Sequence, residues 1–125
     1  MNYNLYVMNE NTIKTKSFQF AIRIVHLYKY LSDEKREYVL SKQILRSGTS
    51  IGANVRESQN AESKADFLHK LGIAQKETDE TLYWLELLEA TSYIDEEEFL
   101  SMHKDANEIL KLVRSIIITS KKNKD

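Results

Sequence analysis

Residues 43–57, with the sequence QILRSGTSIGANVRE, determine how the rest of the chain is interpreted. When this segment and the residues before it are placed on a helix, one face is apolar and recurs at spacings of three and four residues, the period of an amphipathic helix. That face consists of Leu40, Ile44, Gly48, Ile51 and Val55. A polar stripe runs beside it, through Gln43, Ser47, Ser50, Asn54 and Glu57. Two ordered stripes predict a helix that packs against two different surfaces.

Small side chains crowd the middle of the same segment, at Ser47, Gly48, Ser50, Gly52 and Ala53. Each glycine in a helix interior costs roughly 1 kcal/mol relative to alanine. Two of them within five residues therefore indicate that another backbone approaches closely. The alternative is a loop at residues 47–49 between two short helices. The stripes stay in phase on both sides of the glycines, which favours one continuous helix.

Length and composition restrict the class of protein. A chain of 125 residues is long enough for one domain that buries about two-thirds of its unfolded surface. The sequence has no proline and three glycines, so little forces a helix to end. The absence of cysteine excludes disulfides and thiolate metal sites and fits a reducing compartment. No signal peptide and no apolar run of the ~20 residues that a membrane span needs is present, so we expect a soluble cytoplasmic protein without a membrane partner.

The formal net charge of −1 is unevenly distributed along the chain. Residues 1–60 hold nine basic and five acidic side chains, whereas residues 61–125 hold nine basic and fourteen acidic ones. This asymmetry permits a basic surface that binds nucleic acid. It equally permits copies of the chain that attract one another head to tail. Charge alone does not decide between the two.

Hydrophobic periodicity predicts four helices joined by short polar connections. The first starts near Lys16 or Ser17 and ends at about Leu31. The others are expected over residues 37–59, over residues 64–92 and from Asp95 onward. The fold class expected is therefore all-α, an antiparallel up-down-up-down four-helix bundle over residues 15–121. A flexible N-terminal arm (residues 1–14) and a charged tail (residues 122–125) flank it.

Local patterns predict the faces and starts of these helices. In the first helix we expect a buried face of Phe18, Ala21, Ile22, Val25, Tyr28 and Leu31, widened by Phe20, Ile24 and Leu27. Ser63 is expected to cap the third helix, with Asp66 as its acidic partner. The acidic run 95–98 suits the start of the fourth helix, where the helix dipole favours negative charge.

The third helix carries two apolar stripes. The inward stripe consists of Phe67, Leu71, Ala74, Thr78, Leu82 and Leu85. The second stripe keeps heptad spacing about 140° round the helix and contains Ile73, Glu77, Glu80, Trp84 and Leu87. A second apolar face on one helix suggests contact with another subunit. We therefore take Ile73, Glu77, Trp84 and Leu87 as candidate oligomer-interface residues.

Catalytic and metal sites find little support in the sequence. None of the three histidines sits in an H-E-x-x-H or E-x-x-H arrangement, and there is no Gly-rich phosphate loop. We therefore predict no catalytic residue, no metal site and no cofactor. One enzymatic alternative stays open, a Mg²⁺-dependent all-α nucleotide pyrophosphohydrolase that uses the acidic pairs Glu77-x-x-Glu80 and Asp105-x-x-Glu108. Such a site needs several oxygen ligands that converge on one cavity.

A basic stripe on the second helix is the candidate nucleic-acid contact. It comprises Lys42, Arg46 and Arg56, with Lys35 and Arg36 nearby. One copy offers few charges for backbone phosphates, and a ring of copies would multiply them. The alternative is an ordinary solvated helix face.

The central segment also carries a family pattern, Q-l-x-R-S-x-x-S-I-x-x-N-I-x-E-G, followed by a phenylalanine, an Ile-Ala pair and a glutamate. It is met here by Gln43, Arg46, Ser47, Ser50, Ile51, Asn54, Glu57, Phe67, Ile73, Ala74 and Glu80. From Ser17 to Lys121 the chain thus resembles the four-helix-bundle proteins encoded by intervening sequences within bacterial 23S ribosomal RNA genes. It departs from that pattern at Val55, Ser58 and Glu77, where the family has isoleucine, glycine and a small residue.

The resemblance implies a homo-oligomer, a pentameric ring of four-helix bundles, without known catalytic residues. A related protein, the accessory variability determinant of diversity-generating retroelements, points to RNA or DNA and a reverse transcriptase-like protein as partners. Members are often labelled ribosomal because of where some of their genes lie. The polar stripe, with Glu80, would form a hydrogen-bonded seam within or between bundles, where Asn54 and Glu57 meet Arg46 or Ser47 of a neighbour. We therefore expect a non-enzymatic scaffold that binds nucleic acid; a purely structural oligomer is the other alternative.

Overall fold

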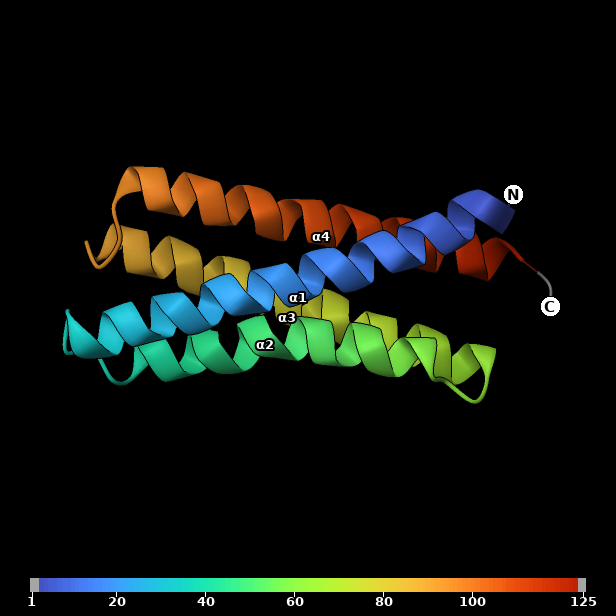
Figure 1. Ribbon diagram of the computed structural model, residues 1–125, viewed down its shortest axis with the longest axis horizontal. Helices are drawn as coiled ribbons and strands as arrows, with labels where there is room; N and C mark the ends of the chain where they lie inside the picture. Colours follow the sequence, from blue (N-terminus) through green and yellow to red (C-terminus); the bar gives the residue numbers. More distant parts are fainter. Residues whose placement is uncertain (1–2, 124–125) are drawn as a thin grey trace.

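The computed structural model describes residues 3–123, with side chains from Asn11 onward. Within this range the chain forms four helices and no strand: α1 (Tyr3–Asp33), α2 (Leu40–Gln59), α3 (Lys64–Ala90) and α4 (Glu96–Lys122). The all-α class and the four helices are therefore confirmed. Each helix packs against two others in the cyclic order α1, α2, α3, α4, so α1 and α3 lie on one diagonal of the bundle. The chain turns back at each of its three short connections (Figure 1).

The helix at the centre of the sequence argument, α2, is continuous through both of its glycines, as predicted. Its apolar stripe is buried at Ile44, Gly48, Ile51 and Val55. The helix that approaches the glycines closely is α1. A Cβ atom added to Gly48 would lie 2.6 Å from Cγ1 of Ile24, and one added to Gly52 would lie 3.3 Å from the carbonyl oxygen of Ser17.

The first helix begins much earlier than predicted. It starts at Tyr3, not near Lys16 or Ser17, so residues 3–14 of the expected flexible arm are helical. The physical reason is that the inward stripe of α1 already includes Ile13, which is 1% exposed, and that no glycine or proline interrupts the segment before it. Residues 1–2 of the expected arm and residues 124–125 of the expected tail lie outside the described residues.

The buried face of α1 also differs from the expected one. The core contains Ile13, Phe20, Ile24, Leu27 and Leu31, whereas Phe18 and Ile22 are 55% and 44% exposed. The prediction of Phe18 and Ile22 as core residues was therefore wrong. Apolar side chains cover most of this helix, so its sequence allows more than one inward face. The side of α1 that packs against α2 is the one that places Ile24 over Gly48.

The remaining helix boundaries follow from local hydrogen bonds. Ser63 caps α3 by accepting the backbone N–H of Asp66 at 3.0 Å, as predicted. Asp95 caps α4 by accepting the backbone N–H of Glu98 at 2.8 Å, and three acidic residues follow in the first turn. The third helix ends two residues before the expected Ser92, which has a positive φ of 66°. Such a backbone conformation does not continue a helix.

Glu37 explains why α2 begins three residues later than predicted. Its carboxylate accepts the backbone N–H groups of Val39, Leu40 and Ser41 at 3.2, 3.1 and 2.8 Å. Burial raises the pKa of Glu37, but the hydrogen bonds from Ser41, Leu40 and Val39 outweigh it and hold the pKa below its ordinary value. Glu37 is thus the side chain that satisfies the first free N–H groups of α2.

No helix within the described range is long and apolar enough to cross a membrane.

Candidate functional site

The surface that the sequence singled out is the outward side of α2 and its seam with α3. Arg46 reaches across this seam to both acidic residues of the Glu77-x-x-Glu80 pair. Its guanidinium lies 3.0 Å from the Glu77 carboxylate and also donates to Glu80. Glu77 is 9% exposed, whereas the Arg46 side chain is half exposed. Arg46 was predicted to bind phosphate, Glu77 to lie in the oligomer interface and Glu80 to belong to the polar seam. The three residues instead form one ion-paired group within a single chain.

Ser47 supplies the second contact across the same seam. Its hydroxyl lies 2.9 Å from that of Thr81, and both residues are fully buried. Thr81 also bonds to the carbonyl oxygen of Glu77 at 2.8 Å. The sequence predicted a hydrogen-bonded seam at Ser47, and the structure supplies its partner from α3. Thr81 had not been predicted as part of the seam.

The other members of the polar stripe bond mostly to their own helix. Ser50 donates to the carbonyl oxygen of Arg46 at 2.6 Å, and Asn54 donates to that of Ser50 at 2.9 Å. Glu57 pairs with Lys70 of α3 at 3.2 Å. Gln43 is exposed. The stripe therefore marks a seam within one bundle at Ser47 and Glu57, and an ordinary helix surface elsewhere.

All five predicted phosphate-binding residues are exposed, but Arg46 is engaged by Glu77 and Glu80. Lys35 and Arg36 lie in the α1–α2 connection, and Lys42 lies in the first turn of α2. Among the side chains described, those of residues 11–123, Arg36 and Lys42 form no ion pair. Arg56 lies about 21 Å further along α2 than Lys42, at 1.5 Å per residue. The basic residues thus form a group at one end of α2 and a separate charge near the other.

Arg56 borders a groove between α1 and α2 that sequence reasoning missed. Its guanidinium lies 5.7 Å from the centre of the exposed Phe18 ring, within cation–π range. The groove also includes Lys14 beside Phe18 and the small residues Gly52 and Ala53. The sequence signal was present, because Phe18 belongs to the second apolar side of α1, but it was assigned to the core.

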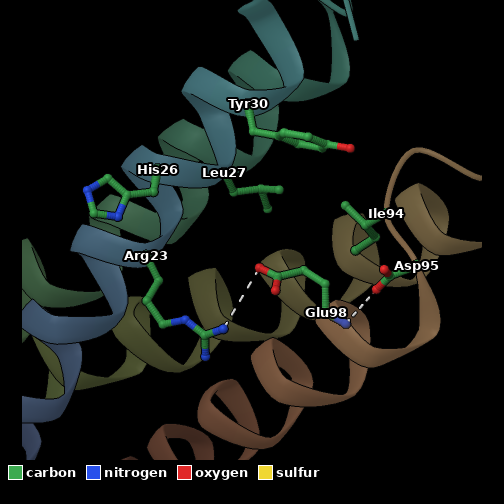
Figure 2. Close-up of a pocket in the computed structure, with 7 residues that line it drawn as sticks. All are labelled: Arg23, His26, Leu27, Tyr30, Ile94, Asp95 and Glu98. Carbon is green, nitrogen blue, oxygen red and sulfur yellow. Dashed lines mark hydrogen bonds and ion pairs between the residues drawn. The ribbon is translucent and has the colours of Figure 1, made fainter. Parts of the chain in front are cut away.

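A pocket at the other end of α1 contains residue types that catalysis uses, yet they do not converge. Figure 2 shows its lining of Arg23, His26, Leu27, Tyr30, Ile94, Asp95 and Glu98. Asp95 accepts the N–H of Glu98, and Arg23 lies 3.8 Å from the Glu98 carboxylate. The His26 ring points away from both acids in this view. The charged groups on the α4 side therefore hold the helix start and the α1–α4 contact.

The two acidic pairs of the hydrolase alternative lie on different sides of the bundle. Glu77 and Glu80 belong to the α2–α3 seam through Arg46, as described above. Asp105 pairs with Arg23 at 2.7 Å and Glu108 with Lys16 at 3.1 Å, both across the α1–α4 seam. Among the described residues no group of three or more His, Cys, Asp or Glu side chains is placed to hold a metal ion. The structure therefore does not bring these pairs together as Mg²⁺ binding requires.

Comparisons with known proteins agree with the motif of residues 43–80. The family model described as 23S rRNA-intervening sequence protein matches residues 9–115. Among solved structures, the chain is similar to the crystal structure of a protein with unknown function from the S23 ribosomal protein family of Bacteroides thetaiotaomicron. The two chains are 58% identical, with a TM-score of 0.87, and the match covers 88% of this chain and 98% of that one. The comparison with curated proteins gave no match.

Proposed function

This chain belongs to the 23S rRNA-intervening sequence protein family, and on that premise we propose that it is a non-enzymatic, nucleic-acid-binding scaffold of the cytoplasm. In this proposal the antiparallel up-down-up-down bundle assembles with copies of itself into a pentameric ring. The ring binds RNA or DNA through backbone phosphates, and its further partner is a reverse transcriptase-like protein.

The observation that supports this proposal is the exposed basic group at the α1–α2 end, formed by Lys35, Arg36 and Lys42. The acidic residue Glu37 lies between Arg36 and Lys42 in the sequence, and its carboxylate accepts hydrogen bonds from three backbone N–H groups. Asp33 at the end of α1 and Glu34 in the connection are also exposed, so with Glu37 three carboxylates match the three cations and the formal charge of this end is zero in one copy. Repetition round a ring gives such a group its affinity, because salt-sensitive binding grows with the number of phosphates neutralised.

Arg46 is left out of the proposed contact because Glu77 and Glu80 already neutralise it. A charge held in this way releases few counterions when a phosphate approaches, and it would have to break two ion pairs to turn outward. The proposed contact therefore consists of Lys35, Arg36 and Lys42, with Arg56 as a separate charge further along α2.

The test measures mass and RNA affinity together. Light scattering gives the mass of the full chain with and without a short structured RNA, at low and moderate salt, and fluorescence anisotropy gives the affinity. We expect a mass near five chains that rises with RNA at low salt. In the variant Arg36→Glu with Lys42→Glu, affinity should fall at least tenfold and the salt slope should become shallower.

The matched control is Lys104→Glu with Lys111→Glu, the same charge change on exposed lysines of α4. It should retain most of the affinity. If both double variants lose affinity equally, the binding is not located at the α1–α2 end. An oligomer that ignores RNA at low salt would mean a purely structural assembly, and the nucleic-acid role would be overturned.

A further inference from the structure

The outward side of α1 presents an apolar surface that none of the other described helices buries. Phe18 and Ile22 are 55% and 44% exposed, and Ala21 and Val25 beside them are half-buried. We name Phe18, Ala21, Ile22 and Val25 the α1 face. Small residues of α2, among them Gly52 and Ala53, continue it as a shallow groove. Adjacent exposed apolar side chains of this size on one helix are typical of a protein interface.

A second apolar surface lies on the outward side of α3. Tyr83 is 56% exposed, Ile73 and Leu87 are half-buried, and a Cβ added to Gly72 would meet nothing within 4 Å. We name Gly72, Ile73, Tyr83 and Leu87 the α3 face. It includes two of the interface residues predicted from the sequence. The other two predicted interface residues have partners within the bundle: Glu77 pairs with Arg46, and Trp84 packs against the core.

The charges around the two faces are complementary. The α1 helix contains four basic and two acidic residues, whereas α3 contains three basic and six acidic ones. Lys14 precedes Phe18 by one turn, and Arg56 lies over the Phe18 ring. Asp79 and Glu86 are exposed one turn to either side of Tyr83. Residues at these spacings are neighbours on a helix surface, so the side chains next to Phe18 and those next to Tyr83 carry opposite charges. Neither face is bordered by one sign alone, because Lys76 is exposed one turn after Gly72 and Ile73 and the groove beside Phe18 is also lined by Glu57, Glu62 and Asp66.

We propose that the α1 face of one copy packs against the α3 face of a second copy. This inference rests on the proposed homo-oligomer and names its contact surfaces. Since α1 and α3 lie on one diagonal of the bundle, each copy offers both faces at once, and the contact is head to tail. Pairing the α1 face with another α1 face would instead bring Lys14 and Arg56 of both copies together, which like-charge repulsion opposes.

The experiment uses three full-length variants that place a glutamate on an exposed apolar position. Ile22→Glu disrupts the α1 face and Tyr83→Glu disrupts the α3 face. Leu100→Glu changes an equally exposed residue of α4, 55% exposed, that belongs to neither face. Because all three positions are exposed, each variant should fold, which circular dichroism and thermal melting verify. At micromolar concentration we expect the 14.6 kDa mass of one chain for the first two variants and the wild-type mass for Leu100→Glu.

Mixing the two disrupted variants tests the head-to-tail arrangement directly. The Ile22→Glu chain keeps an intact α3 face and the Tyr83→Glu chain keeps an intact α1 face, so an equimolar mixture should form a species of two chains and no larger one. If the wild type is an oligomer and both variants remain oligomers, the proposed contact is overturned while the scaffold proposal stands. A wild-type monomer overturns the oligomer itself. Dissociation of Ile22→Glu alone, without rescue on mixing, would mean that α1 faces pair with each other and would overturn the head-to-tail contact.

Discussion

Gly48 of α2 faces Ile24 of α1 so closely that a Cβ atom at position 48 would lie between 2.6 and 2.9 Å from three carbons of the Ile24 side chain. This contact fixes which side of α1 enters the core. With Ile24 over the glycine, Phe20 and Leu27 are buried and Phe18 and Ile22 are left on the surface. Because Gly48 has no side chain, Ile24 packs against it, and the side of α1 that carries Phe18 and Ile22 remains on the surface.

Gly48→Val should therefore destabilise the protein by about 2 kcal/mol, because the added carbons displace Ile24 from a packed core. The matched control is Gly72→Ala on α3, where the added Cβ has open space. That variant should be more stable than the wild type by about 1 kcal/mol, the difference in helix propensity. Urea denaturation measures both free energies of unfolding. A stable Gly48→Val variant would show that α1 and α2 are less closely packed than described.

Removal of Arg46 alone should cost more than removal of Arg46 together with Glu77. Arg46→Met leaves the Glu77 carboxylate, 9% exposed, without its cation. We expect a loss of about 2 kcal/mol, less than for a fully buried pair because water reaches the half-exposed Arg46 side chain. The double variant Arg46→Met with Glu77→Met should recover most of that loss. Chemical denaturation of the wild type, both single variants and the double variant completes the cycle, and additive losses in the double variant would contradict the pairing.

The hydroxyl pair Ser47–Thr81 should behave as a unit. Thr81→Val removes one hydroxyl and leaves that of Ser47 buried without its 2.9 Å partner, so we expect a loss of about 1–2 kcal/mol. The double variant Thr81→Val with Ser47→Ala lacks the Ser47 hydroxyl as well, and its free energy of unfolding should be only slightly lower than that of Thr81→Val. Additive losses in thermal or urea unfolding would show that the two hydroxyls do not interact.

Glu37 gives the start of α2 a pH dependence with a defined sign. Since its pKa in the folded chain is lowered, its contribution is fully present above the pKa of the unfolded chain. It is lost as the pH falls through the lower, folded-state pKa. Near neutral pH, Glu37→Gln should be less stable than the wild type by about 1 kcal/mol, the usual value of a helix cap. Urea midpoints measured from neutral to acid pH should converge for the two proteins, and a difference that is constant with pH would contradict the capping role.

Features set by neighbours in the sequence could be predicted well. The apolar stripe of α2, its continuity through Gly48 and Gly52, and the Ser63 cap all depend on side chains within about one helical turn. The family pattern is likewise a local feature of residues 43–80, and the match over residues 9–115 agrees with it. The start of α1 was missed because the polar run at residues 9–12 interrupts the apolar period before Ile13, although no glycine or proline there ends a helix.

The candidate site could be predicted only in part, because its partners come from other helices. Arg46 was predicted from its position on α2, but Glu77 and Glu80, which neutralise it, lie more than thirty residues away on α3. A helical wheel cannot show whether a cation faces solvent or an acid on the next helix. For the same reason Phe18 was placed in the core, although Arg56 lies over its exposed ring.

The sequence by itself determined that this protein is all-α, that it has four helices, where α2 lies and to which family it belongs, because hydrophobic period, caps and motif are local properties. The tertiary structure decided which side of α1 is buried and that the two acidic pairs lie on different seams. It also decided that the α1 and α3 faces lie on one diagonal of the bundle. These three features depend on how one helix packs on another. At Gly48, for example, the absence of a side chain lets the side of α1 that carries Ile24 pack into the core.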